Sequence, residues 1–474
     1  MKKSLFLALL FVFSYSFTFA NDGYRIEIEI DNYEPDTLVA GYYFGKQTLV
    51  LDTLLKNDNG GFILQDSDTL DAGVYLLLLK PDNQFVQFLV DEKEQQFSIA
   101  FDAEDLTKVK IEGSSDNQLF NDYMVFLRSR RELREPLVEQ SNMEGISEID
   151  KTAIAIQIEK LDAEVKAEQD KIVEAYPESI TSILIKANRP IETPDFEGTE
   201  EEVHAQKYNY YRAHYFDNID MDNPKSIRTP FFNDRIDYFL KKLTYQVPDS
   251  MIQSVDYILE SIKPSEKSYQ YYLSQFINEF ANSKIVGQDA IYVHIAENYY
   301  GAGKAPWVAE ENVKKIVSDA QKIKPLLIGK PAPDFTAYNF EGEEVPFSSI
   351  DAEYRVLFFW KPECGHCTKA VPIVKEFYKN YKDKGVEIIS ICTKLGKDYN
   401  QCWDGIEEKN MGEFVNLGDQ YQRSKVLKKY NATQTPRFFI IDKEDTIVMK
   451  GIGANQLGAV IDEMLQRAAK KQAE

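Results

Sequence analysis

Residues 355–381 read RVLFFWKPECGHCTKAVPIVKEFYKNY, and this stretch decides the fold of the C-terminal part of the chain. Its first half is an apolar run that predicts a buried strand, and its second half has the apolar spacing of an amphipathic helix. Cys364 and Cys367 stand at the junction, within the first turn of the expected helix. Two intervening residues in one helical turn bring two sulfur atoms within disulfide distance. The stretch therefore predicts a redox-active pair at a helix N-terminus.

The position of Cys364 predicts its chemistry. The first backbone N–H groups of a helix have no partner inside the helix, and the helix dipole adds positive potential at this end. Both effects stabilise a thiolate, so we expect a lowered pKa for Cys364 and assign it as the nucleophile, with Cys367 as the second catalytic cysteine. His366 can add partial positive charge and make the disulfide more oxidising. The Cys364–Cys367 disulfide is the redox group that we predict, without a further cofactor.

Composition argues against several other kinds of site. The 474 residues carry 77 acidic and 55 basic side chains, which gives a formal charge of −22. Such acidity repels phosphate backbones and argues against a nucleic-acid partner. Four histidines in the whole chain argue against a histidine-rich metal centre, so no metal site is predicted. Four cysteines are too few for a disulfide-stapled small scaffold.

Residues 326–474 form a region with its own composition and pattern. They hold 21 lysines and arginines against 22 acidic residues, so nearly all of the negative charge lies upstream. Strand-like runs alternate here with helical segments, and the runs are RVLFFW, VEIISIC, RFFIID and TIVMKG. Alternating strands and helices predict an α/β sheet. The change of composition predicts a domain boundary near residue 326.

The upstream residues divide into a β segment and a helical segment. Within residues 21–115, Ile26, Ile28 and Ile30 alternate with glutamates, and several short runs of this kind are separated by turn residues. This pattern predicts a small sandwich of antiparallel strands. Residues 116–325 carry apolar side chains at helical spacing and are expected to be all-α. The β segment holds no recognisable catalytic constellation, so a structural or docking role is expected for it. The many tyrosines of the helical segment fit either a sugar- or peptide-binding surface or packing at helix–helix contacts, and we favour packing.

Residues 1–20 have the pattern of a secretory signal peptide. Two lysines precede a short apolar run, and a more polar stretch follows in which the small residues Thr18 and Ala20 fit the −3 and −1 positions of a cut, which predicts cleavage before Asn21. The apolar run is shorter than the roughly 20 residues that a spanning helix needs. We therefore expect an exported, periplasmic chain with no stable membrane span after cleavage. The alternative is an uncleaved N-terminal anchor in the inner membrane.

The C-terminal region resembles the thioredoxin superfamily, and more narrowly the exported TlpA/ResA-like thiol-disulfide oxidoreductases. Trp360 stands four residues before Cys364, and Pro372 stands eight after it, as in thioredoxins. Thr435-Pro436 precedes the strand RFFIID, where the family has a cis-proline beside its disulfide. The segment GKPAPDF, residues 329–335, is similar to the entry strand of TlpA-like and peroxiredoxin-like domains.

The resemblance implies a fold and a set of site residues. It implies a thioredoxin fold for the C-terminal domain, behind the β and helical segments that similar exported redoxin-like proteins also carry. Trp360 is then expected to shape an apolar rim around the cysteines, and the cis-proline to hold a backbone edge where a substrate strand pairs. The substrate-positioning residues implied in this way are Trp360, His366, Thr435 and Pro436.

One position departs from the family pattern. Thioredoxins have a buried aspartate six residues before the first cysteine, and here that residue is Phe358. The usual proton acceptor for Cys367 is therefore missing. Glu363 is a possible replacement that would act through a water molecule; alternatively it faces the surface and only raises the thiol pKa.

Cys392 and Cys402 allow three interpretations. They form a structural disulfide, they are unrelated buried thiols, or Cys392 modulates the active pair. We favour two unpaired buried thiols, because free cysteine packs as a small hydrophobic residue. A zinc site built from all four cysteines fits least well, since Cys392 and Cys402 are too far apart in sequence for a compact ligand pair.

The sequence therefore supports two main functional hypotheses. The first is an exported thiol-disulfide oxidoreductase, with reductase favoured by the TlpA/ResA resemblance and oxidase or isomerase favoured by the CGHC motif. Its partners would be exported cysteine-containing proteins and a membrane-linked thiol donor. The second is an envelope binding or docking protein whose redoxin domain is mainly structural. A peroxidase fits less well, because Lys361 occupies the position where peroxiredoxins keep a threonine.

Overall fold

The computed structural model describes residues 23–473, so the predicted signal peptide lies outside the described residues. The chain divides into two compact units. The first contains the residues up to Leu243 together with Ile258–Tyr269, and the second contains Thr244–Tyr257 together with the residues from Gln270 on. None of the helices within residues 23–473 combines the length and hydrophobicity that a bilayer crossing requires.

The first unit begins with a β-sandwich, as predicted. Two four-stranded sheets have the strand orders β4–β1–β7–β8 and β3–β2–β5–β6. Alternate residues of both sheets point into one core, in which Ile26 and Ile28 of the first sheet pack with Leu77 and Phe88 of the second. The strands are β1 (Tyr24–Asp31), β2 (Thr37–Phe44), β3 (Gln47–Leu55), β4 (Phe62–Asp66), β5 (Gly73–Leu79), β6 (Gln84–Val90), β7 (Gln96–Asp102) and β8 (Asp105–Glu112).

One pairing in the sandwich differs from the prediction. β1 runs parallel to β7, with Ile26 opposite Phe97 and Ile28 opposite Ile99, whereas antiparallel strands were expected throughout. A parallel pair needs a long crossover connection, and here residues 32–95 provide it. The sequence pattern could not reveal this, because alternation of apolar and polar residues is the same in either strand direction.

The first unit continues into a helical hairpin. Its two long helices pack on each other around Tyr123 and Ile172, with Ile185 of the next helix in the same cluster. Ser114 caps the first helix, since its side chain accepts a hydrogen bond from the backbone N–H of Asn117. The helices of this segment are α1 (Ser115–Ser141), α2 (Glu148–Ala175), α3 (Ile180–Ala187), α4 (Glu200–Ala213) and α5 (Phe232–Lys242), with a 3₁₀ turn at Ser226–Arg228.

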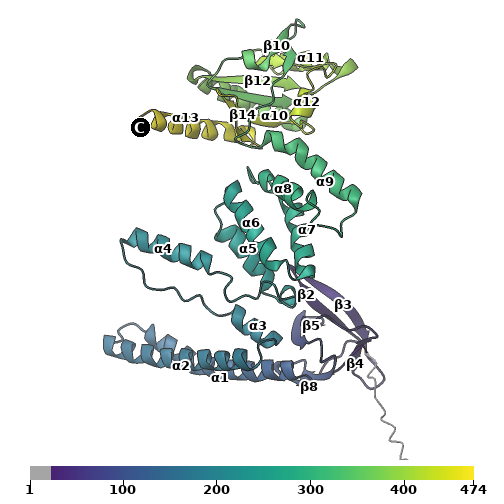
Figure 1. The fold of residues 1–474 in the computed structure, drawn as a ribbon, viewed down its shortest axis with the longest axis vertical. Coiled ribbons are helices and arrows are strands. Elements are labelled where there is room, and N and C mark those ends of the chain that lie inside the picture. Colours follow the sequence, from purple (N-terminus) through teal and green to yellow (C-terminus); the bar gives the residue numbers. More distant parts are fainter. Residues whose placement is uncertain (1–22, 474) are drawn as a thin grey trace, which may run out of the picture. The chain divides into compact units, whose positions relative to one another are not determined.

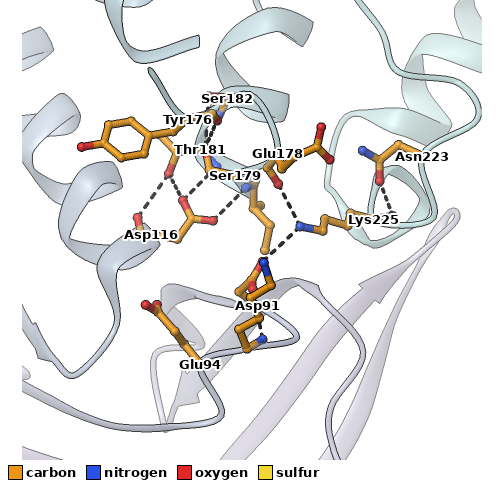
Figure 2. A network of polar contacts seen from close by, with 12 residues as sticks. Asp91, Glu94, Asp116, Tyr176, Glu178, Ser179, Thr181, Ser182, Asn223 and Lys225 are labelled. Carbon is orange, nitrogen blue, oxygen red and sulfur yellow. Dashed lines mark hydrogen bonds and ion pairs between the residues drawn. The ribbon is translucent and has the colours of Figure 1, made fainter. Parts of the chain in front are cut away.

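A buried polar network joins the sandwich to these helices (Figure 2). The carboxylate of Asp116 accepts hydrogen bonds from the backbone N–H of Ile180 at 2.7 Å and from the hydroxyl of Thr181 at 2.6 Å. Lys225 donates to Asp91 at 3.0 Å and to the carbonyl of Glu178 at 2.8 Å. Asp116 thus caps the N-terminus of α3 from a neighbouring helix, which fixes α3 beside the start of α1.

The remaining helices precede the C-terminal domain, and the predicted all-α region is helical as expected. They are α6 (Pro248–Ile262) and α7 (Glu266–Asn282), each shared between the two units, then α8 (Asp289–Ile295), a π-helical turn (Ala296–Tyr300), α9 (Glu310–Ile323) and a 3₁₀ turn (Lys324–Leu326). The helices from α3 to α9 are the teal and green coils of Figure 1.

The C-terminal domain has the predicted thioredoxin-like fold, built on a five-stranded sheet of order β13–β12–β11–β14–β15. β11, β12 and β13 are parallel, and β14 and β15 are antiparallel to their neighbours. The strands of the sheet are β11 (Tyr354–Trp360), β12 (Val386–Cys392), β13 (Val415–Leu417), β14 (Arg437–Asp442) and β15 (Ile447–Lys450). A separate hairpin is formed by β9 (Thr336–Tyr338) and β10 (Glu344–Pro346).

Both faces of this sheet are covered. Phe358 and Trp360 of β11 face a core shared with α10, α11 and α13, while Leu357 and Phe359 face a second core shared with α12. Because β11 and β12 are parallel, the residues that follow them meet at one edge of the sheet, which is where the cysteines lie. The helices are α10 (Gly365–Tyr381), α11 (Gln401–Glu408), α12 (Val426–Lys429) and α13 (Leu457–Ala473), with 3₁₀ turns at Phe347–Ser349, Lys382–Lys384, Gly396–Asp398 and Ala454–Gln456.

Candidate active site

Cys364 is the N-cap residue of α10. Its backbone is extended, with φ −79° and ψ 108°, as is usual for an N-cap. The backbone N–H of Cys367 donates a hydrogen bond to the Sγ of Cys364 at 3.2 Å. The sulfur therefore occupies the place that an oxygen of serine or aspartate takes in an ordinary cap. This position stabilises negative charge on the sulfur.

Two opposing effects set the thiol pKa of Cys364. Burial raises the pKa, since only 9% of the residue is exposed. Hydrogen bonds with the side chains of Cys367 and Thr435, and those from the backbone N–H groups of Cys367 and His366, lower it. The hydrogen bonds outweigh burial, so the pKa of Cys364 lies below that of an ordinary cysteine, as predicted.

Cys367 has the opposite character. Its side chain is fully buried, and this burial, together with the neighbouring Cys364, raises its thiol pKa to about 11. Both residues are free thiols in this structure. The site thus holds one acidic sulfur near the surface and one protonated sulfur beneath it, three residues apart in sequence.

The loop before β14 lies against the nucleophilic sulfur. The Thr435–Pro436 peptide bond is cis, as the family resemblance implied. The thiol of Cys364 donates to the backbone carbonyl oxygen of Thr435 at 3.4 Å. Both Thr435 and Pro436 are half-buried, so part of this backbone is exposed beside Cys364.

Trp360 does not line an exposed rim, and that expectation was wrong. The residue is fully buried, and its indole N–H donates to the hydroxyl of Ser390 at 3.1 Å. Ser390 in turn donates to the side chain of Asn416 at 2.7 Å. Trp360 is the last residue of β11 and points into the core, so it supports the cysteine loop from inside the domain instead of meeting a substrate directly.

An aromatic stack replaces the buried acid of thioredoxins. Phe358 is fully buried and stacks on Phe438 with ring centroids 4.9 Å apart, and on Trp360 at 6.4 Å. The sequence predicted that an acidic group is missing here, and the stack fills its position with apolar surface. A proton leaving Cys367 therefore has no carboxylate at this position to receive it.

Glu363 and His366 lie at the surface beside the cysteines. Glu363 is exposed and forms an ion pair with Lys394, whose Nζ lies 2.5 Å from its Oε1. Partial burial raises the pKa of Glu363, but the hydrogen bond and charge of Lys394 outweigh it and hold that pKa below the usual value. Glu363 is thus held as a carboxylate that faces Lys394. His366 contributes its backbone N–H to Cys364, and its imidazole is exposed.

Cys392 and Cys402 are joined in a disulfide with Cα atoms 5.9 Å apart. The interpretation that they are unpaired thiols was therefore wrong. Cys392 ends β12 and Cys402 lies in the first turn of α11, and both are buried in the core that also contains the active cysteines. Ten positions of separation looked long in sequence, but the connecting loop turns back and brings α11 onto the end of the strand.

Three residues of the site were not predicted from the sequence. Thr368 donates its hydroxyl to the carbonyl of Cys364 at 3.3 Å, Ser390 holds Trp360, and Lys394 pairs with Glu363. The signal for Lys394 was present in the chain: it follows a strand that runs parallel to β11, so both strands end at the same edge of the sheet.

Comparison with known protein families finds three matches along the chain. The AhpC/TSA family matches residues 328–450. Two domains of unknown function match upstream, DUF5106 over residues 167–324 and DUF4369 over residues 24–120. The matched segments follow the order of the α/β, helical and β parts of the fold.

Individual relatives resemble part of the chain. A thiol-disulfide oxidoreductase ResA of Bacillus cereus is 32% identical over 139 residues, which cover 29% of this chain and 74% of the relative. The ResA of Bacillus thuringiensis subsp. konkukian is 30% identical over 149 residues, covering 31% and 81%. A solved domain of a possible thiol-disulfide isomerase from Cytophaga hutchinsonii aligns at 27% identity with a TM-score of 0.29, covering 32% of this chain and 99% of that one.

Proposed function

Since the chain belongs to the ResA-like thiol-disulfide oxidoreductases of the thioredoxin superfamily, we propose that it reduces disulfide bonds of exported proteins through Cys364 and Cys367. That the chain is a thiol-disulfide oxidoreductase follows from the family. The redox direction, the two cysteines as the reacting groups and the exported partners are the proposal.

The contrast between the two thiols carries the proposal. Cys364 accepts a hydrogen bond from the backbone N–H of Cys367, and its pKa is lowered, so it forms the thiolate more readily than an ordinary cysteine does. The pKa of Cys367, about 11, keeps that sulfur protonated until Cys364 has reacted. A nucleophile beside a resolving thiol is the arrangement that disulfide exchange requires.

The proposed reaction has two steps. The thiolate of Cys364 attacks one sulfur of the substrate disulfide, so that a mixed disulfide forms and the other substrate sulfur leaves and takes up a proton. Cys367 then loses its proton to solvent and attacks the Sγ of Cys364, which releases the second substrate thiol. The substrate gains two electrons and two protons, and the enzyme becomes the Cys364–Cys367 disulfide. A membrane-linked thiol donor would return the two electrons.

Thr435 and Pro436 are the proposed contact for the substrate chain. The carbonyl of Thr435 lies 3.4 Å from the Sγ of Cys364, and the cis bond that follows turns the backbone beside the sulfur. An extended substrate segment that pairs with this backbone would bring its disulfide onto Cys364. His366 is proposed to flank the same opening, since its side chain is exposed next to the nucleophile.

Activity on insulin provides the direct test. Wild type is expected to reduce insulin disulfides in the presence of dithiothreitol, and Cys364→Ser is expected to lose this activity. A double variant, Cys392→Ala with Cys402→Ala, is the matched control, because it removes two cysteines of the same domain but leaves the proposed pair. Equal activity of wild type and Cys364→Ser would overturn the proposal and favour a binding role for the chain.

The reduction potential tests the direction of transfer. A reduction potential of about −270 mV, as in thioredoxin, would support a reductase. A reduction potential of about −120 mV would identify an oxidant instead. Trapping with Cys367→Ser addresses the partners. This variant cannot resolve the mixed disulfide, so the proteins captured from an envelope extract are expected to be exported and to contain cysteine.

A further inference from the structure

Lys394 reaches the cysteine loop from the neighbouring strand. β11 and β12 are parallel, with Trp360 opposite Cys392. The pairing extends past the last residues of both strands, since the backbone N–H of Thr393 donates to the carbonyl of Trp360 at 2.9 Å. Lys394 therefore follows directly alongside the residues that lead from β11 to Cys364.

The side chain of Lys394 is largely buried and has a defined partner. It is 19% exposed, and its ammonium lies 2.5 Å from the carboxylate of Glu363, which is 52% exposed. Glu363 immediately precedes Cys364 in sequence. The charge of Lys361 also acts on the same carboxylate. The stem of Lys394 is thus packed against the domain while its ammonium meets a single carboxylate, so the fold holds the pair in place.

Both sides of the pair are anchored. Cys392, two residues before Lys394, is tied by its disulfide to Cys402 of α11. α11 also packs closely on the cysteine loop, because a Cβ added to Gly405 would lie 2.9 Å from the Cγ of Pro362 and 3.2 Å from the Trp360 ring. The loop that contains Glu363 and the strand end that contains Lys394 are thus fixed against the same helix.

We propose that Lys394 is a positioning residue of the disulfide-exchange site: its ammonium holds and neutralises the carboxylate of Glu363, the residue that immediately precedes the nucleophile Cys364. This inference rests on the proposed function and adds to it a residue that does not itself react. The ionisable residues within three positions of Cys364 on its own loop and helix are Lys361, Glu363, His366 and Cys367, and Lys394 reaches Glu363 from the end of the neighbouring strand.

Substitution of Lys394 and substitution of Glu363 are then expected to shift the thiol pKa of Cys364 in opposite directions. Lys394→Gln removes the ion-pair partner of the carboxylate that precedes Cys364, and a less compensated negative charge raises the free energy of a nearby thiolate. Glu363→Gln removes that carboxylate and leaves the ammonium, which favours the thiolate. If the ion pair had only a structural role, the thiol pKa of Cys364 would shift in the same direction in both variants, because each variant breaks the same ion pair.

The test is the pH dependence of Cys364 alkylation in the reduced full-length chain. Iodoacetamide labelling of the peptide that contains Cys364 is followed by mass spectrometry between pH 5 and pH 9. We expect about threefold less thiolate at pH 7 in Lys394→Gln and about threefold more in Glu363→Gln, the size expected for one partly screened neighbouring charge. The double variant, Lys394→Gln with Glu363→Gln, should have nearly the same fraction of thiolate as wild type. Lys394→Arg should show the wild-type dependence of labelling on pH.

Lys397→Gln is the matched control, because Lys397 is an exposed lysine of the same loop. It should leave the profile unchanged. Shifts of the same sign in Lys394→Gln and Glu363→Gln, or an unchanged profile in both, would overturn the inference while wild type still reduces insulin. Failure of the wild type to reduce insulin would instead overturn the proposed function, so the two failures are distinguishable.

Discussion

The Sγ of Cys364 accepts a hydrogen bond from the backbone N–H of Cys367 at 3.2 Å, so one of the two cysteines caps the helix turn that contains the other. The pKa of Cys364 is consequently lowered, although its burial acts in the opposite direction. The pKa of Cys367 is about 11. The two thiols of the reduced site should therefore differ widely in reactivity.

This difference predicts selective labelling. At pH 7, iodoacetamide should modify Cys364 at least about tenfold faster than Cys367, because the thiolate is the reacting form and Cys367 is both protonated and buried. The two peptides can be quantified separately by mass spectrometry after brief labelling. Comparable rates for the two thiols at pH 7 would contradict the assignment of Cys364 as the nucleophile.

Removal of the second disulfide should cost stability. The Cys392–Cys402 bond closes a short loop, and for a loop of this size the expected loss in the free energy of unfolding is about 3 kcal/mol. The variant is Cys392→Ala with Cys402→Ala, and calorimetry should show a lower transition temperature for the C-terminal domain. A transition temperature equal to that of wild type would show that the bond contributes no stability.

A carboxylate in place of Phe358 should not be tolerated. The ring of Phe358 is fully buried between Phe438 and Trp360, so Phe358→Asp loses the stack and also buries a polar group. We expect a loss of about 4 kcal/mol or more in the free energy of unfolding, measured with urea. Phe340→Asp is the matched control, since Phe340 is 69% exposed and should change stability much less. An equal loss in both variants would mean that burial of Phe358 is not the cause.

Asp116 should make the stability of the first unit depend on pH. Burial raises the pKa of Asp116, and this effect outweighs the hydrogen bonds from Thr181 and Ile180 that lower it. A carboxyl group whose pKa is higher in the folded chain stabilises the fold at low pH, and this contribution is lost as the pH rises through the folded value. The transition temperature of wild type relative to Asp116→Asn should therefore fall as the pH rises from about 4, the ordinary pKa of an aspartate, towards neutrality.

Calorimetry of both proteins across this range gives the comparison. Asp122→Asn, at an exposed position of the same helix α1, is the control for loss of one negative charge. A stability advantage of wild type over Asp116→Asn that grows as the pH rises would contradict the predicted direction.

The sequence predicted best those features of the site that depend on local geometry or on a family motif. The spacing of Cys364 and Cys367 was sufficient to predict their place at the start of α10, because it depends only on local helix geometry. The Thr435–Pro436 bond could be predicted from the family resemblance, and it is cis.

Features that depend on tertiary approach were missed or misjudged. Trp360 was expected at a rim, but the direction of the last β11 side chain is set by the strand pairing that buries it. The disulfide between Cys392 and Cys402 depends on how the loop after β12 folds back, and no local pattern encodes that turn. The ion pair of Glu363 with Lys394 joins the ends of two strands that a whole helix separates in sequence.

The parallel pairing of β1 with β7 has a consequence for how the chain is made. β1 emerges from the ribosome before β7, yet one of its two edges stays unsatisfied until Gln96–Asp102 have been synthesised. During that interval an apolar, hydrogen-bonding strand is open to other chains, and contacts so distant in sequence form slowly. The sandwich thus keeps one edge of β1 available to other chains until β7 has been made.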